Sequence, residues 1–535
     1  MKRDLPTAVQ LEKGGGGGGH GHPTRRAPRL VSLSLLALIL LASALLALVL
    51  DALPAEHQPA LLADALCTLS QPLSTLPISL ALLAGPLLLP FGRRQPTPTA
   101  TAESIGGPSS TWRGSGLGCH TRLGGGGGGG GARTFWRLPE ERKAAAREEP
   151  DADELPDLLT ATLEQLERGL DRGLFTSVQL VKAYLARIEE VNHAGPKLNA
   201  VIETAPREYL LAEAARRDEE RAQGKKRGYL HGIPILVKDN FATNASMSLN
   251  TTAGSYALLG AVSPRNARII TDAVERGGAI ILGKTNMSAW AQFRGYLDAQ
   301  GWSPRGGYTT SAYFPGGNTC GSSSGSAVAA SVGLAGATLG TETDGSIVCP
   351  ASSNALVGFK PTVGLVSRAG TIPISSTQDS GGPIVQTVAD AARVLTDVAT
   401  LGGFDGYDEA TRHRPRHARR GVDYVRAIER RGGTRALEGV RIGILADEFV
   451  NATLGEFDPA VLPLYEHAID TLRKAGAVLV DAVIPTTEDW FELADEAEAV
   501  VSGTEFKVRL NEYLAELEHV PSAVYDMAGL IYFEA

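Results

Sequence analysis

The sequence GGNTCGSSSGSAVAASVGLAGATLGTETDGSIVCP, residues 316–350, contains two clusters of glycine and hydroxyl residues, at 316–326 and 340–346. Glycine permits positive φ and a close approach of a ligand to the backbone. Consecutive N–H groups in such turns can bind an anion or a developing oxyanion. A flexible Ser/Gly linker has a similar composition, but a linker would not lie beside apolar runs such as Ala327–Leu334 and Leu356–Phe359. The segment therefore indicates an anion-binding site within a folded domain.

Helix-like and strand-like patterns alternate on both sides of this segment. The expected elements are a capped helix at 176–191, a strand at 232–237 that ends at Lys238, an amphipathic helix at 265–276, strands at 279–282, 441–445 and 478–480, and a helix after Asp458–Pro459. The first helix begins with a capping box, Thr176–Gln179, which satisfies two N–H groups of the first turn. Strands separated by helices predict an α/β fold with parallel pairing.

The stretch from Gly321 to Arg368 resembles the amidase signature, and the similarity extends over 155–535. Supporting phrases are HGIPILVKDN (231–240), GKTN (283–286), GFKPT (358–362) and TVAD (387–390). Within the family, TDGSIVCP (343–350) is similar to the branch that includes bacterial peptide amidases and many fungal amidases. The resemblance implies a mixed, largely parallel β-sheet covered by helices, which agrees with the α/β pattern.

The resemblance also implies a role for each catalytic position. Lys238 matches the family's catalytic lysine, Ser322 its bridging serine, which follows a cis peptide bond in the family, and Ser346 its acyl-forming serine. A serine hydroxyl becomes a useful nucleophile when a base takes its proton, and Ser322 can relay that proton to a neutral Lys238. The backbone N–H groups matched to the oxyanion hole belong to Thr343, Asp344, Gly345 and Ser346.

These positions predict hydrolysis of a carboxamide to a carboxylic acid and ammonia through an acyl-enzyme on Ser346, with no metal or cofactor. Peptide C-terminal amides, fatty amides and small aliphatic or aryl amides all fit, and the resemblance favours peptide-like amides. Two positions depart from the common family pattern: Asp344 stands where many members have Gly, and Val348 where many have Arg. The second difference argues against the tRNA-amidotransferase branch.

Three other interpretations compete with this one. Family members continue beyond the equivalent of Ala535, so the chain is expected to lack the C-terminal part of the domain, and an inactive amidase-like fragment is the main alternative. Gly321–Gly325 fits the GxSxG turn of α/β-hydrolases, which would make Ser323 the nucleophile. Gly278–Thr285 fits the P-loop pattern, but its variable positions Ala-Ile-Ile-Leu are typical of a strand. The histidines available to an α/β-hydrolase site are His413, His417, His467 and His519.

Residues 1–150 differ in composition from the rest, with six consecutive glycines at 14–19 and eight at 124–131. Such a region predicts a disordered low-complexity tail, or translated non-coding sequence, in front of the domain. The uncharged apolar run Leu30–Leu50 has 21 residues, enough to span a bilayer as a helix. It is a candidate membrane span or signal segment. A genuine span would place the protein in a membrane or the secretory pathway, and without one we expect a cytoplasmic protein.

Charge and cysteine content limit the classes of partner. The formal net charge of -8 argues against a nucleic-acid partner. The four cysteines show no CxxC or Cys/His spacing, so neither a zinc site nor a disulfide framework is indicated. The expected partner is a small-molecule or peptide amide substrate, and the sequence predicts no particular oligomeric state. The cysteines are Cys67, Cys119, Cys320 and Cys349.

Overall fold

The computed structural model describes residues 155–535, apart from 295–299, 315, 403, 430–432, 446–458 and 483–486. The predicted tail 1–150, with its apolar segment 30–50, lies outside the described residues. Among the helices of the described part, none is long and apolar enough to cross a membrane. The longest, α16 (Thr487–Ala515), has 29 residues but carries charged side chains along its length. For the described residues, this finding corrects the expectation of a transmembrane helix.

A mixed six-stranded sheet forms the centre of the domain. Its strands lie in the order β1-β3-β2-β6-β8-β7. The central strands β3, β2 and β6 are parallel, whereas β1, β8 and β7 pair antiparallel to their neighbours. This sheet with a parallel centre confirms the predicted α/β fold class. The bounds are β1 Val201–Thr204, β2 Pro234–Lys238, β3 Ile280–Thr285, β6 Ala337–Glu342, β7 Val357–Gly358 and β8 Ser380–Val385.

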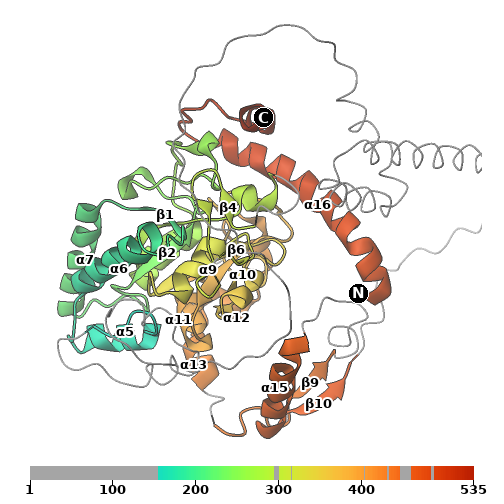
Figure 1. Ribbon diagram of the computed structural model, residues 1–535. Helices are drawn as coiled ribbons and strands as arrows, with labels where there is room; N and C mark the ends of the chain where they lie inside the picture. Colours follow the sequence, from blue (N-terminus) through green and yellow to red (C-terminus); the bar gives the residue numbers. More distant parts are fainter. Residues whose placement is uncertain are drawn as a thin grey trace, which may run out of the picture. The chain divides into compact units, whose positions relative to one another are not determined.

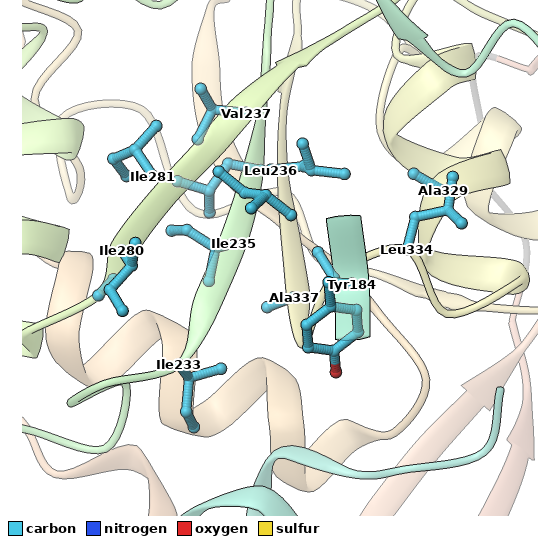
Figure 2. Packing of buried hydrophobic residues seen from close by; sticks show 14 of the residues in the cluster. Tyr184, Ile233, Ile235, Leu236, Val237, Ile280, Ile281, Ala329, Leu334 and Ala337 are labelled. Carbon is cyan, nitrogen blue, oxygen red and sulfur yellow. The ribbon is translucent and has the colours of Figure 1, made fainter. Parts of the chain in front are cut away.

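Strand β2 is buried along its whole length, as expected for a strand of a parallel sheet covered on both faces. Helices α6 (Ser177–Ile188) and α9 (Ser324–Ser331) both contact it. Figure 2 shows side chains of β2 and β3 gathered with Tyr184 of α6 and Ala329 of α9 in one apolar cluster. Because β2 ends at Lys238, this packing fixes the position of that lysine.

The remaining helices follow from local signals in the sequence. Thr176 caps α6 through the predicted capping box with Gln179, so this prediction is confirmed. Helix α7 (Arg207–Ala222) packs beside α6, as Figure 1 shows. Helix α11 (Val388–Val398) contacts β8 and is capped by the side chain of Thr387. Further helices are α5 Leu163–Asp171, α10 Val348–Ser353, α12 Arg416–Arg419, α13 Tyr424–Glu429 and α17 Met527–Glu534.

The predicted helix 265–276 is shorter and less regular than expected. It begins as α8 (Arg268–Thr271) and continues as a π-helix, η5 (Asp272–Gly277). Gly278 ends it with a φ of 77°, a left-handed conformation that favours glycine. The strand that follows, β3, continues to Thr285, so the predicted strand 279–282 is confirmed and extended.

A smaller unit near the C-terminal end contains a strand–helix–strand arrangement. Strands β9 (Arg441–Ile444) and β10 (Val478–Asp481) pair in parallel, and α15 (Leu462–Lys474) lies between them in sequence. All three elements were predicted from the sequence, with boundaries within a few residues. A separate antiparallel pair, β4 (Trp302–Ser303) and β5 (Gly307–Tyr308), completes the strands of the described residues.

Candidate active site

Two neighbouring strands of the sheet bring the candidate residues together. Strands β2 and β6 are parallel and in register, with Ile235 opposite Ala337. Lys238 at the end of β2 therefore lies beside the end of β6, where the second glycine-rich cluster begins. Ser322 precedes α9 and follows a cis peptide bond from Gly321. The backbone N–H of Ser323 donates to the carbonyl of Ser346 at 3.2 Å, which joins the two clusters directly.

Lys238 is completely buried and contacts one of the predicted catalytic serines. Its Nζ lies 2.7 Å from Ser322 Oγ and 3.1 Å from the carbonyl oxygen of Thr341. Burial lowers the pKa of Lys238 to about 7, against the opposing charges of Asp379 and Glu342. Near pH 7 the lysine is then neutral in a large fraction of the molecules, and the neutral amine has a lone pair that can accept a proton.

Asp239 follows Lys238 but its carboxylate is held away from the amine. Oδ2 accepts hydrogen bonds from the hydroxyl of Thr252 and, at 2.9 Å, from the backbone N–H of Gly254. Burial raises the pKa of the Asp239 carboxyl, and the charges of Lys284 and Arg305 oppose that effect. The neighbouring acid therefore does not form an ion pair with Lys238.

Ser346 lies in a tight turn between β6 and α10. Gly345 has a φ of 75°, and Ser346 is buried with 5% of its surface exposed. The carboxylate of Glu342 accepts the N–H groups of Ile347 at 2.7 Å and Val348 at 2.9 Å, which folds the chain around Ser346. Sequence reasoning did not single out Glu342, although it lies in the glycine-rich segment itself.

The backbone N–H groups predicted to form the oxyanion hole are free to bind a ligand. Among the hydrogen bonds of the described residues, none uses the N–H groups of 343–346. The four residues are Thr343, Asp344, Gly345 and Ser346. Unpaired donors on consecutive residues are what stabilisation of an oxyanion requires.

The hydroxyl groups of Ser322 and Ser346 are not hydrogen-bonded to each other among the described contacts. Contacts between catalytic groups are often loose without substrate and tighten when it binds. The backbone bond between Ser323 and Ser346 still keeps the two serine segments adjacent.

A disulfide links the segments that carry the two serines, which corrects the expectation that no disulfide is indicated. Cys320 precedes Ser322 by two residues, and Cys349 follows Ser346 by three. The two cysteines are 29 residues apart in sequence, but their Cα atoms lie 5.9 Å apart. A pairing across such a separation in sequence has no spacing signature, because it arises only when β6 and the turn after it return the chain to Cys320.

The structure does not support the two competing motif interpretations. Ser323 is fully buried and its hydroxyl donates to the carbonyl of Thr341 at 3.0 Å, not to a histidine. Lys284, the lysine of the P-loop pattern, lies within strand β3. Its buried Nζ donates to the carbonyl of Phe241 at 2.6 Å and to Thr251 Oγ1 at 2.8 Å. Neither motif has the strand–loop–helix context that its function needs.

One further acid beside the site escaped sequence reasoning. Asp379 is held in the loop before β8, and its Oδ1 accepts the hydroxyl of Thr343 at 2.6 Å. Both line a small pocket next to Lys238's neighbours Asn240 and Thr341. An aspartate in a short polar loop carries no pattern of its own, so only the fold reveals this contact.

The central strand β2 ends at a buried lysine whose amine contacts Ser322, so the chain belongs to the class of α/β proteins with a lysine–serine site. The comparison with family models identifies the class more closely. The chain belongs to the amidase family, whose model matches residues 179–521. The C-terminal truncation expected from the sequence is a prediction that this match does not test.

Relatives of known sequence and structure agree with this family. The chain is 41% identical over 372 residues to a probable amidase of Arabidopsis thaliana, covering 69% of this chain and 67% of that protein. It is 40% identical to a putative amidase of Arthroderma benhamiae, covering 62% of this chain and 56% of that protein. The structure of native peptide amidase from Stenotrophomonas maltophilia matches with a TM-score of 0.61 and 44% identity, covering 70% of this chain and 71% of that one.

Proposed function

We propose that the protein is an amidase that hydrolyses a carboxamide to a carboxylic acid and ammonia through an acyl-enzyme on Ser346. The observation that carries the proposal is the contact of 2.7 Å between Lys238 Nζ and Ser322 Oγ, in a buried site that lowers the pKa of the lysine to about 7. A lysine that is neutral near pH 7 can serve as a general base.

In the proposed first step, Ser346 Oγ attacks the amide carbon while its proton passes to Ser322 Oγ, and the proton of Ser322 passes to Lys238 Nζ. The carbonyl oxygen becomes an oxyanion, which the free N–H groups of 343–346 stabilise. The proton then returns from Lys238 through Ser322 to the amide nitrogen, and ammonia leaves. In the second step water attacks the ester on Ser346 by the same proton route, which releases the acid.

Peptide-like primary amides are the proposed substrates. The 44% identity to the peptide amidase of Stenotrophomonas maltophilia over 70% of this chain supports this class. Val348 stands where many family members have arginine, a difference that argues against the tRNA-amidotransferase branch. Fatty amides and small aryl amides are the alternatives that a substrate panel has to include.

Ammonia release from a peptide C-terminal amide tests the proposal. We expect steady turnover by the wild type and a loss of roughly 10⁴-fold or more in Ser346→Ala, since removal of a nucleophile abolishes the covalent route. Ser352→Ala, an exposed serine on α10, is the matched control and should keep the wild-type rate. Turnover equal in the wild type and Ser346→Ala would refute the proposed chemistry, and no turnover on any amide would favour the inactive, amidase-like alternative.

A further inference from the structure

A short polar loop, residues 374–379, approaches the Ser346 turn from the side of β8. Asp379 closes this loop: its Oδ2 accepts the N–H groups of Ile374 at 2.8 Å and Ser375 at 3.0 Å. The other oxygen, Oδ1, accepts the hydroxyl of Thr343 at 2.6 Å. The Asp379 carboxylate therefore joins the 374–379 loop to the first residue of the Ser346 turn.

The outer side of the 374–379 loop is held by α16, the long helix near the C-terminal end (Figure 1). The carboxylate of Glu505 on α16 accepts the hydroxyls of Ser375, Ser376 (2.9 Å) and Thr377 (3.0 Å), and the N–H of Thr377 at 3.3 Å. Burial alone would raise the pKa of Glu505, but the hydrogen bonds from the loop outweigh it and hold the pKa below its usual value. The ionised Glu505 carboxylate therefore holds the loop through these hydrogen bonds.

The loop has a third attachment that leaves Asp379 little freedom. Arg368 Nη1 donates to the carbonyl of Ser376 at 2.7 Å, while the rest of its guanidinium pairs with Asp408. The half-buried Asp379 carboxyl accepts hydrogen bonds from three donors. Such a group is fixed by its surroundings and can fix its partner Thr343 in turn.

The position of Thr343 matters because its backbone N–H begins the row of free donors at 343–346. Among the described contacts, the hydroxyl bond to Asp379 is the side-chain anchor of Thr343. Donors of an oxyanion hole act only when they are preorganised at the place where negative charge develops. A loss of this anchor would leave the turn folded by Glu342 but its first donor free to move.

We infer that Asp379 is a positioning residue of the amidase site, which fixes Thr343 for oxyanion stabilisation, and that Glu505 of α16 holds the loop from which Asp379 acts. This inference rests on the proposed function. Asp379 does not touch the reacting atoms, so it acts through Thr343. The fold thereby couples Glu505 of α16, more than 150 residues beyond Ser346 in sequence, to the geometry of catalysis.

The matched pair Thr343→Val and Thr343→Ser tests the anchor with minimal change in shape. Valine replaces the hydroxyl with a methyl group of similar size, whereas serine keeps the hydroxyl and loses the methyl group. We expect kcat of Thr343→Val to fall by about tenfold with KM within about twofold, because a misplaced donor weakens transition-state binding more than substrate binding. Thr343→Ser should stay within about threefold of the wild type. The kcat of Glu505→Gln should lie between those of Thr343→Val and Thr343→Ser.

Asp379→Asn adds a readout that a merely structural role would not move. The charged groups that act on Lys238 are Asp379 and Glu342, and both raise its pKa against burial. Removal of the Asp379 charge therefore lowers the pKa of Lys238, so the acid limb of the pH–rate profile shifts to lower pH. Thr343→Val keeps that charge, and its acid limb should coincide with that of the wild type.

The outcomes separate this inference from the proposed function. A normal kcat in Thr343→Val would overturn the positioning role while the wild type still turns over. An acid limb that does not move in Asp379→Asn would overturn the effect of the Asp379 charge on Lys238. If the wild type neither releases ammonia nor forms a covalent adduct on Ser346 with a fluorophosphonate, the proposed function fails and the inference fails with it. Thermal unfolding of each variant identifies any that do not fold, and the Thr343 pair decides the question if Asp379→Asn is one of them.

Discussion

Replacement of Lys238 by arginine separates a catalytic base from a fixed positive charge. A lysine with the ordinary pKa of 10.5 would be neutral in about one molecule in 3,000 at pH 7, whereas a pKa of about 7 leaves about half of the molecules neutral. Burial of Lys238 therefore increases the base-competent fraction by about 10³-fold, or roughly 4 kcal/mol. Arginine stays protonated in proteins and has no lone pair to offer.

We expect Lys238→Arg to lose at least about 10³-fold in kcat/KM, as much as Lys238→Met, even though arginine preserves the charge. The wild-type kcat/KM should rise with pH to a plateau with a midpoint near 7, the pKa of the buried lysine. The sign follows from the lowered pKa: below the midpoint the ammonium form dominates, and the rate should fall about tenfold per pH unit.

The assay is kcat/KM for one primary amide between pH 5 and 9, measured for the wild type, Lys238→Arg and Lys238→Met. Thermal unfolding of the same samples shows whether each variant is folded, since a guanidinium in place of a fully buried amine can disturb packing. If folded Lys238→Arg keeps a tenth or more of the wild-type rate, or if the wild-type profile shows no ionisation near 7, the lysine is not the base.

Three further perturbations test other parts of the account. Ser323→Ala should keep kcat/KM within about threefold and lower the free energy of unfolding by about 1 kcal/mol, because its hydroxyl only donates to the carbonyl of Thr341; a rate loss comparable to that of Ser346→Ala would contradict this. Reduction with dithiothreitol, or the double variant Cys320→Ser with Cys349→Ser, should lower the free energy of unfolding by about 3 to 4 kcal/mol, a value that follows from the 29-residue separation of the cysteines. The same change should lower activity, and an unchanged melting temperature would show that the disulfide does not form. Deletion of residues 1–150 should leave kcat and KM unchanged, since its glycine runs lack a core pattern; a large loss of activity would make the tail part of the fold.

The sequence predicts the elements whose signal is local. The capping box at Thr176–Gln179 defines the start of α6, and the apolar run before Lys238 defines β2. The helix expected at 265–276 is less regular, since η5 takes a π-helical form before Gly278. The apolar spacing over so few residues does not distinguish an α-helix from a π-helix.

The residues of the candidate site also divide into those that the sequence motifs predict and those whose contacts only the fold reveals. The motifs of the resemblance name Lys238, Ser322 and Ser346, and the structure brings Lys238 and Ser322 into contact. The contacts of Asp379 and Glu505 depend on loops that meet only in the fold, and so does the pairing of Cys320 with Cys349. Such contacts join residues far apart in sequence, and a single sequence carries no spacing rule for them.

The central claim is that Ser346 forms the acyl-enzyme while Ser322 and Lys238 move its proton. Labelling with a fluorophosphonate, followed by digestion and mass mapping of the modified peptide, tests it most directly. The account predicts a single adduct on Ser346, absent in Ser346→Ala and strongly slowed in Lys238→Arg. An adduct on Ser323 with Ser346 unmodified would contradict it and restore the α/β-hydrolase interpretation.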